Sequence, residues 1–201
     1  MKQLKYPQPI ENLIESLRQI PGIGRKTAER YAFNILSWQK QDLFNLAKVI
    51  HDMPSKISKC STCRCLKSDQ GCQFCTSTSR DTSSLCIVAS VKDVFLIEET
   101  GVFKGLYHVI DHLFSPLDGQ MLSKEDLAPV LERIQKLCVK EIILAFDSTL
   151  EGDATSLYLQ DLVKNFSVST TRLALGIPMG SSLDFIDEHT LSKAFVGRVS
   201  V

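Results

Sequence analysis

Four cysteines in two pairs place the strongest constraint on how this chain can fold. Cys60 and Cys63 form one C-x2-C pair, and after eight intervening residues Cys72 and Cys75 form a second. Residues 60–84 are otherwise rich in Ser and Thr and nearly free of aliphatic side chains, so this segment cannot bury a core of its own. Because two C-x2-C pairs can chelate opposite sides of a tetrahedral Zn2+, the spacing predicts a small zinc ribbon or knuckle with one zinc ion per chain. Zinc binding then contributes on the order of 10 kcal/mol to folding of the segment and compensates for the missing core.

Two other uses of paired cysteines compete with the zinc interpretation. Disulfides are disfavoured in a reducing cytoplasm, and a redox-active C-x2-C pair needs a neighbouring βαβ pattern that is not evident here. Cys65 follows Cys63 by two residues and can replace it as a ligand, although the paired spacing favours Cys63. Cys86 and Cys138 lie in apolar patterns and are interpreted as small buried hydrophobic residues.

The first 54 residues show the apolar periodicity of three helices. Apolar side chains recur at helical spacing over 10–20, 28–36 and 43–50. Pro9 suits the first turn of the first helix, and the third helix is expected to end before Pro54.

The turn between the first two helices reads Pro-Gly-Ile-Gly at residues 21–24, with Ile23 expected to fill the space between the helices. Backbone N–H groups at the start of the following helix, together with its dipole, favour a phosphate, and three cations lie close by. The pattern resembles the helix-hairpin-helix motif, which grips the DNA backbone without reading sequence. The alternative is a plain helical hairpin that packs subunits together, and both can hold. The candidate DNA-binding residues are Gly22, Gly24, Arg25, Lys26 and Arg30.

From residue 85 onward, apolar strands alternate with helical patterns, which is typical of an α/β domain with a mainly parallel sheet. One helix is placed to begin near Asp126, because Pro129 is expected to be tolerated only in a first turn. The strands are expected at 85–89, 107–110, 141–146 and 171–175, and the helices at 91–99, 126–137, 154–166 and 191–195.

Three carboxylates follow the strand at 141–146: Asp147, Glu151 and Asp153. Ligands in open α/β sheets bind at the carboxyl ends of strands, and Mg2+ prefers oxygen ligands, so these residues can together hold Mg2+. Equally, they can simply cap the next helix and complement its dipole.

This acidic motif resembles the Toprim domain shared by topoisomerases, primases and some nucleases. A Toprim enzyme usually carries a Glu at the end of its first strand as general acid or base, but here that place is taken by Ala89. Thr149 stands where topoisomerase-like members carry a further Asp. Alanine cannot transfer a proton, and the second departure removes an acidic side chain. Both departures therefore weigh against strand cleavage or phosphoryl transfer.

The charge of the chain is zero overall but uneven along its length. It has 23 Lys+Arg and 23 Asp+Glu, yet residues 1–85 contain 13 and 7 of these, against 10 and 16 in residues 86–201. A basic half can meet phosphates, and an acidic half can meet a metal or a basic protein, although both can also be solvated surfaces. No apolar run approaches the roughly 20 residues that span a bilayer, and the N-terminus lacks the apolar core of a signal peptide, so a cytoplasmic protein without membrane contact is expected.

These features predict an α+β multidomain chain. Its expected parts are a helix-hairpin-helix DNA-binding domain at 1–54, a four-cysteine zinc segment at 55–84, a Toprim α/β domain at 85–175 and a C-terminal segment at 176–201.

The order of hairpin, four-cysteine site and Toprim motif is similar to that of the RecR family of recombination-repair proteins. Further stretches that carry the resemblance are 113–119, 151–155, 176–180, 190–192 and 197–198. The resemblance implies a non-catalytic DNA-binding mediator that helps to load the recombinase RecA on gapped DNA. The implied partners are single- and double-stranded DNA bound without sequence specificity, RecO and possibly RecF, with a homo-oligomeric dimer or tetramer ring.

On this resemblance, the hairpin cations face DNA, and the acidic surface with Glu151 and Asp153 faces RecO. Two alternatives stay open: a Mg2+-dependent Toprim-type nuclease or topoisomerase-like enzyme, and a pure protein-interaction module.

Overall fold

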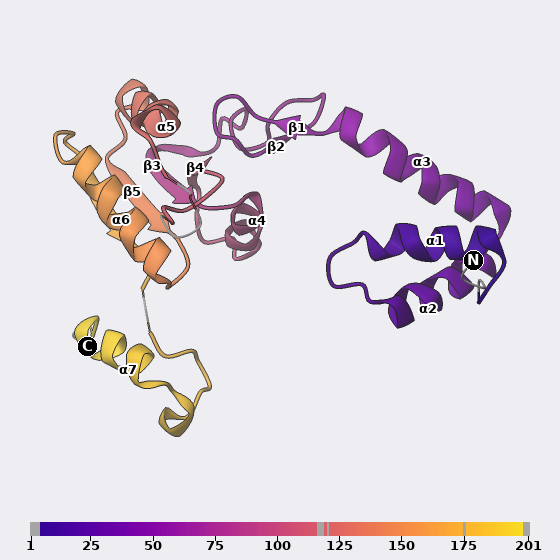
Figure 1. Ribbon diagram of the computed structural model, residues 1–201. Coiled ribbons are helices and arrows are strands. Elements are labelled where there is room, and N and C mark those ends of the chain that lie inside the picture. The colour runs from indigo at the N-terminus through magenta and orange to yellow at the C-terminus, as the bar shows by residue number, and fades with distance from the viewer. Residues whose placement is uncertain (1–4, 116–118, 120, 175, 199–201) are drawn as a thin grey trace. The chain divides into compact units, whose positions relative to one another are not determined.

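The computed structural model describes residues 5–115, 119, 121–174 and 176–198. The chain divides into two compact units, Met1–Lys56 and Ile57–Val201 (Figure 1). The helical hairpin lies in the first unit, and the cysteine segment, the α/β domain and the C-terminal segment lie in the second. Within the described residues, no helix is both long and apolar enough to cross a bilayer.

The first unit consists of α1 (Gln8–Arg18), α2 (Arg25–Leu36) and α3 (Lys40–Lys56). α1 and α2 form the expected hairpin around the buried side chains of Ile14, Ala28 and Ala32. The two alanines have small side chains, so the helices can approach closely. Ile23 is partly buried against this core, which confirms its expected place between the helices.

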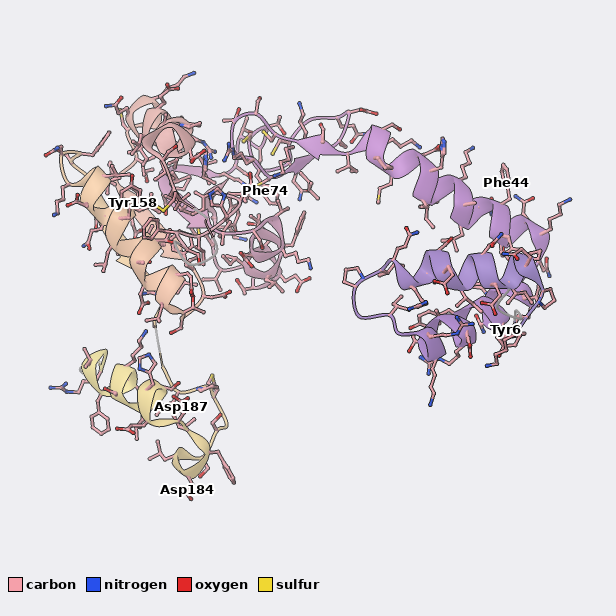
Figure 2. The ribbon with its side chains drawn as sticks, viewed as in Figure 1. Tyr6, Phe44, Phe74, Tyr158, Asp184 and Asp187 are labelled. Carbon is pink, nitrogen blue, oxygen red and sulfur yellow. The ribbon has the colours of Figure 1, made fainter. Side chains whose placement is uncertain are left out.

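α3 is longer and less buried than the sequence pattern predicts. The expected end before Pro54 is wrong, because the helix includes Pro54 and continues to Lys56. Pro54 lies in the last turn of the helix. Its missing N–H removes one hydrogen bond there, next to the last four carbonyl groups, which have no partner within the helix in any case. None of the described α3 residues is buried, and Phe44 projects into solvent (Figure 2).

The second unit is built on a four-stranded parallel sheet in the order β4-β3-β5-β6, which confirms the expected parallel arrangement. The bounds are β3 (Asp81–Val88), β4 (Gly105–Val109), β5 (Glu141–Ala145) and β6 (Ser169–Arg172). The helices that connect the strands are α4 (Val91–Glu99), α5 (Lys124–Leu137) and α6 (Leu150–Val163).

The cysteine segment packs on one face of this sheet. Leu85 and Ile87 of β3 share a core with residues of α5 and α6, whereas Cys86 and Val88, on the other side of the strand, share a second core with the cysteines and α4. Within the segment, β1 (Ser58–Lys59) pairs antiparallel with β2 (Leu66–Lys67). The backbone N–H of Val109 donates to the carbonyl of Cys63 at 2.9 Å, which ties the segment to edge strand β4.

Two helix starts differ from the prediction because local capping outweighs the apolar pattern. α6 begins at Leu150 instead of 154, since the Thr149 side chain accepts a hydrogen bond from the Gly152 N–H at 3.1 Å. α5 begins at Lys124, because Ser123 and Asp126 form a capping box. Pro129 therefore lies in the second turn and not in the first.

The C-terminal segment contains a short 3-10 helix, η2 (Leu183–Phe185), and α7 (Glu188–Val196), which covers the helical pattern expected at 191–195. The proposed strand end at Leu175 and part of the 113–119 stretch lie outside the described residues.

Candidate metal centre and nucleic-acid interface

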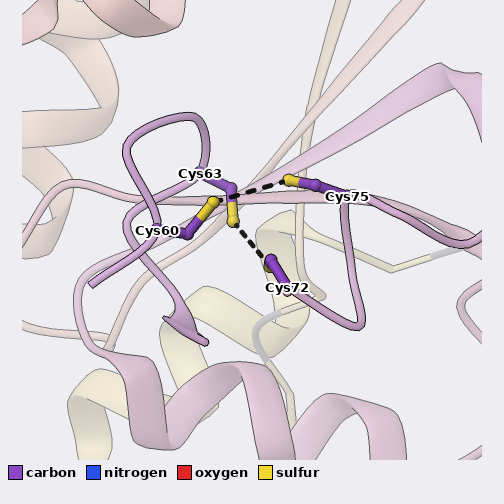
Figure 3. A group of neighbouring side chains, drawn as sticks. All are labelled: Cys60, Cys63, Cys72 and Cys75. Carbon is purple, nitrogen blue, oxygen red and sulfur yellow. Dashed lines mark hydrogen bonds between the residues drawn. The ribbon is translucent and has the colours of Figure 1, made fainter. Parts of the chain in front are cut away.

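The four paired cysteines converge on one point. Their Sγ atoms all lie within 4.8 Å of one another, and they form the one such group of three or more His, Cys, Asp or Glu side chains in the described part of the chain. The Sγ atoms of Cys63 and Cys72 are 3.5 Å apart, and those of Cys60 and Cys75 are 4.0 Å apart (Figure 3). A tetrahedron with Zn–S bonds of about 2.3 Å has S···S edges of about 3.8 Å, so the cluster can hold a metal ion and fits zinc.

Tight turns bring each pair of cysteines together. In the first pair, the N–H of Arg64 donates to the carbonyl of Cys60 at 2.9 Å, and Arg64 adopts a left-handed φ of 61°. In the second pair, the N–H of Cys75 donates to the carbonyl of Cys72 at 3.0 Å. These turns explain why two intervening residues suffice to aim both thiols of a pair at one centre.

The thiols alone do not favour a fully charged cluster. Hydrogen bonds from Cys65 and Cys75 hold the pKa of Cys63 far below its ordinary value, whereas hydrogen bonding to Cys63 and burial raise the pKa of Cys75. The two thiols therefore differ in how readily they ionise, since the pKa of Cys63 is lowered and that of Cys75 is raised. Four thiolates need a divalent cation among them, which a tetrahedral metal supplies.

The remaining cysteines fall into different environments. Cys65 is fully buried beside the cluster but outside the group of four. Cys86 is buried in β3 as expected, and burial raises its pKa to about 12. Cys138 contradicts the expectation of a buried residue: it is exposed, because it forms the left-handed C-cap of α5 with φ 50° and so lies past the apolar face of that helix.

Phe74 is a site residue that the sequence reasoning missed. It lies between Cys72 and Cys75, is 1% exposed, and packs edge-to-face on Tyr107 of β4 with ring centroids 5.4 Å apart. Figure 2 shows its side chain where the cysteine segment meets the sheet. An aromatic residue between two ligand cysteines in a segment nearly free of aliphatic side chains was the available signal, because that segment needs at least one large apolar anchor.

The hairpin turn presents an open helix N-terminus. Gly22 has φ 84°, a left-handed conformation that favours glycine. Gly24 is the N-cap of α2 and provides no side-chain cap, while its carbonyl accepts the Ala28 N–H at 2.9 Å. The first-turn N–H groups of α2 are therefore free of a side-chain acceptor and can bind an anion.

The three candidate cations beside this turn divide into two kinds. Arg25 is engaged internally: its guanidinium pairs with Glu11 at 2.9 Å, Glu29 at 3.2 Å and Glu15 at 3.3 Å. These bonds, led by the one to Glu11, raise the pKa of Arg25. Lys26 and Arg30 are exposed and form no ion pair within the described residues.

The three candidate carboxylates do not share a centre in the described structure. Asp147 is exposed after β5, and Glu151 and Asp153 lie in the first turn of α6. Asp153 is occupied by two cations: Arg172 of β6 at 2.6 Å and Lys193 of α7 at 3.0 Å. Hydrogen bonds to Lys193 and Arg172 lower the pKa of Asp153.

Arg172 and Lys193 were not identified from the sequence, because they are 19 and 40 residues from Asp153 and belong to no local motif. Gly152, between the two acids of α6, was also overlooked. A Cβ atom there would lie 2.1 Å from the carbonyl oxygen of Asp147, so only glycine lets α6 begin this close to the end of β5.

Comparison with known proteins accounts for most of the chain. Residues 10–53 match the family described as RecR, helix-hairpin-helix, residues 83–174 match the Toprim domain, and residues 176–199 match RecR, C-terminal.

Full-length relatives agree with these matches. The recombination protein RecR of Chlamydia pneumoniae is 49% identical over 198 residues, covering 98% of both chains. That of Chlamydia abortus is 48% identical over 197 residues, covering 97% of this chain and 98% of the relative. That of Protochlamydia amoebophila is 42% identical over 195 residues, with coverage of 97% and 98%. A hairpin, a four-cysteine cluster and a Toprim sheet in one chain, together with these similarities, show that the chain belongs to the RecR family of recombination proteins.

Proposed function

We propose that this chain is a DNA-binding mediator of recombination repair that grips the phosphate backbone with its hairpin and catalyses no reaction. The observation that carries the proposal is the uncapped N-terminus of α2, with Lys26 and Arg30 exposed beside it. Free N–H groups, a helix dipole and two exposed cations suit a phosphate and do not read base sequence. Binding is therefore independent of sequence and extends to single- and double-stranded DNA.

In this proposal Arg25 has a different role from its neighbours. Its guanidinium holds Glu11 and Glu15 of α1 against the start of α2, so it fixes the geometry of the turn. Lys26 and Arg30 then contact phosphates. The sequence alone led us to expect that Arg25, Lys26 and Arg30 all face DNA, and we propose instead one positioning cation and two contact cations.

The Toprim domain serves partner binding in this proposal. Asp147 is exposed and Glu151 is half-buried at the carboxyl edge of the sheet, so both can face a basic protein such as RecO, with RecF as a further partner. Asp153 is already paired with Arg172 and Lys193 and offers little to an outside cation. Loading of RecA on gapped DNA follows from this bridging role, with the chain acting as a dimer or a tetramer ring.

Two observations favour a mediator over a Mg2+-dependent nuclease or topoisomerase-like enzyme. Ala89 follows β3, where a Toprim enzyme carries a proton-transferring Glu. The acid that completes the motif, Asp153, is neutralised by the chain's own side chains. The Mg2+ ion considered from the sequence has no preassembled group of three acidic ligands within the described residues.

The decisive experiment measures DNA affinity as a function of salt for the parent protein and two variants. Lys26→Ala should reduce the slope of log affinity against log salt by about 0.9 on duplex DNA, as loss of one phosphate contact requires. Lys48→Ala removes the same charge from an exposed position of α3 and should leave the slope unchanged. Equal slopes for parent and Lys26→Ala would remove the hairpin from the proposal.

Strand integrity separates the mediator from the enzyme. Gapped duplex DNA incubated with the protein and Mg2+ should be bound and recovered intact on a denaturing gel. Cleavage that Asp153→Asn abolishes would establish the enzymatic alternative.

A zinc ion in the four-cysteine centre completes the proposal. Cys60, Cys63, Cys72 and Cys75 would hold it, and its chemistry there is structural, because four protein ligands leave no open coordination position. Elemental analysis should find about one zinc per chain, as a single tetrahedral site requires.

A further inference from the structure

Arg133 is a buried cation beside the cysteine cluster. It lies on α5 and is 7% exposed. Its Nη1 donates to the carbonyl of Tyr107 on β4, and its Nη2 lies 3.8 Å from the Sγ atom of Cys75. A buried guanidinium is strongly destabilising unless a negative group accompanies it, so the partner of Arg133 needs to be identified.

No carboxylate fills that role within the described residues. Arg133 belongs to none of the ion pairs there, and its Nε has no hydrogen-bond acceptor. The other cations of this region are committed: Lys59 and Arg64 both pair with Asp111, at 2.6 and 3.6 Å. Among the described residues, the polar groups that Arg133 reaches are the carbonyl of Tyr107 and the thiol of Cys75.

The metal centre supplies the missing charge. Four thiolates around Zn2+ carry a net charge of −2, and the Sγ of Cys75 belongs to that group. Arg133 is therefore the buried cation that accompanies a doubly negative centre.

We propose that Arg133 is the counter-cation of the tetrathiolate zinc centre and that it couples this centre to the Toprim sheet through Cys75 and the Tyr107 carbonyl. The proposal rests on the zinc occupancy proposed above. It makes Arg133 a positioning residue, since it acts on a ligand and not on the metal itself. The contact bridges 58 residues of sequence between Cys75 and α5.

This arrangement gives the zinc centre a second function besides folding its own segment. Cys63 binds the edge strand through the Val109 N–H, and Cys75 binds α5 through Arg133. Loss of zinc removes the doubly negative centre and leaves the buried guanidinium without its counter-charge, which destabilises the side of the sheet where β4 and α5 meet. Zinc binding and the stability of the Toprim domain are therefore linked.

Two variants test the charge. Arg133→Met keeps the length and apolar stem of the side chain and removes the charge, and Arg133→Lys keeps the charge and loses the two-pronged geometry. Outer-shell partners of metal ligands typically change metal affinity 10–100-fold, so Arg133→Met should release zinc to a chromogenic chelator about 10–100-fold faster than the parent, with Arg133→Lys in between. In the cobalt-substituted protein, the thiolate-to-metal absorption band should shift in Arg133→Met.

Arg172→Met is the matched control, because it also removes an arginine of the second unit, but one that is half-buried and pairs with Asp153. It should leave zinc release and the cobalt spectrum unchanged. If the parent contains zinc and Arg133→Met leaves zinc release and the cobalt spectrum unaltered, the proposed role of Arg133 is overturned while the zinc centre stands. A folded parent free of zinc would overturn the proposed zinc centre and this inference together.

A measurement on the unmutated protein covers the case in which Arg133→Met does not fold. Hydrogen exchange of the parent should show that chelation of zinc lowers protection in α5 and β4 as well as in the cysteine segment. Protection lost in residues 58–76 alone would show that the centre is not coupled to the sheet and would overturn the proposal.

Discussion

Phe74 provides the sharpest test of how the cysteine segment is attached to the sheet. Its ring lies between Tyr107 and Phe95, with centroid distances of 5.4 and 5.8 Å, and the guanidinium carbon of Arg80 lies 5.1 Å from its centroid. At 1% exposure it is the largest apolar side chain of the segment and is in full contact with the core below. Phe74→Ala removes this anchor without touching a thiol.

The magnitude follows from burial and ring geometry. Truncation of a buried Phe to Ala costs about 3–5 kcal/mol, and two edge-to-face partners place this site in the upper half of that range. For a unit of roughly 150 residues each kcal/mol changes Tm by about 2–4 °C, so a decrease of roughly 8–20 °C is expected. Because Phe74 lies between two cysteines of the cluster, zinc release should also accelerate.

This decrease in Tm is measured by thermal unfolding of the zinc-loaded protein, monitored by near-ultraviolet circular dichroism. Phe95→Ala is the matched control, since Phe95 belongs to the same ring cluster but is 39% exposed, and it should lower Tm by less than half as much. A Tm for Phe74→Ala within about 2 °C of the parent, corresponding to less than about 1 kcal/mol, would show that Phe74 does not anchor the segment.

Three further changes separate local from long-range effects. Gly24→Asp should cap α2 and raise the stability of the hairpin by about a few tenths of a kcal/mol, while its carboxylate blocks the phosphate site and weakens DNA binding. Gln41→Asp adds the same charge to α3 and should leave DNA binding intact. Equal DNA affinities of the two variants would exclude the helix N-terminus as the site. The pKa of Asp153 is lowered below its ordinary value of 3.8, so its ion pair with Lys193 of α7 should persist at neutral pH and be lost only as the pH falls through that lowered value. Hydrogen exchange of α7 measures this loss, and Asp153→Asn should show the same loss of protection at pH 7. Cys60→Ser should lose zinc whereas the exposed Cys138→Ser should retain about one ion per chain, and equal metal content by elemental analysis would contradict the four-cysteine assignment.

Much of the site could be predicted because its parts are local in sequence. C-x2-C spacing brings two thiols to one side of a metal through a single turn, so both pairs were identifiable without the fold. The Pro-Gly-Ile-Gly turn likewise sets the hairpin and leaves the α2 N-terminus uncapped. Errors arose where capping competes with apolar periodicity. Thr149 and Ser123 begin helices earlier than the apolar stripes do, and a helix tolerates Pro54 in its last turn.

The roles of individual charges could not be predicted in the same way. Three cations beside one turn look alike in sequence, but only packing of α1 against α2 brings Glu11 within 2.9 Å of Arg25 and engages its guanidinium in an internal ion pair. Asp153 has the spacing of a Toprim metal ligand, yet β6 and α7 supply the cations that occupy it.

Residue spacing and apolar period therefore suffice to predict the hairpin, the cysteine pairs and the alternation of strands and helices, because each of these is encoded within a few turns of chain. Which charges are free and which are paired depends instead on contacts between distant parts of the chain. Arg133 meets Cys75 across 58 residues, and Lys193 meets Asp153 across 40. Such contacts depend on how strands are ordered in the sheet and which helices cover it, and no local pattern records that order.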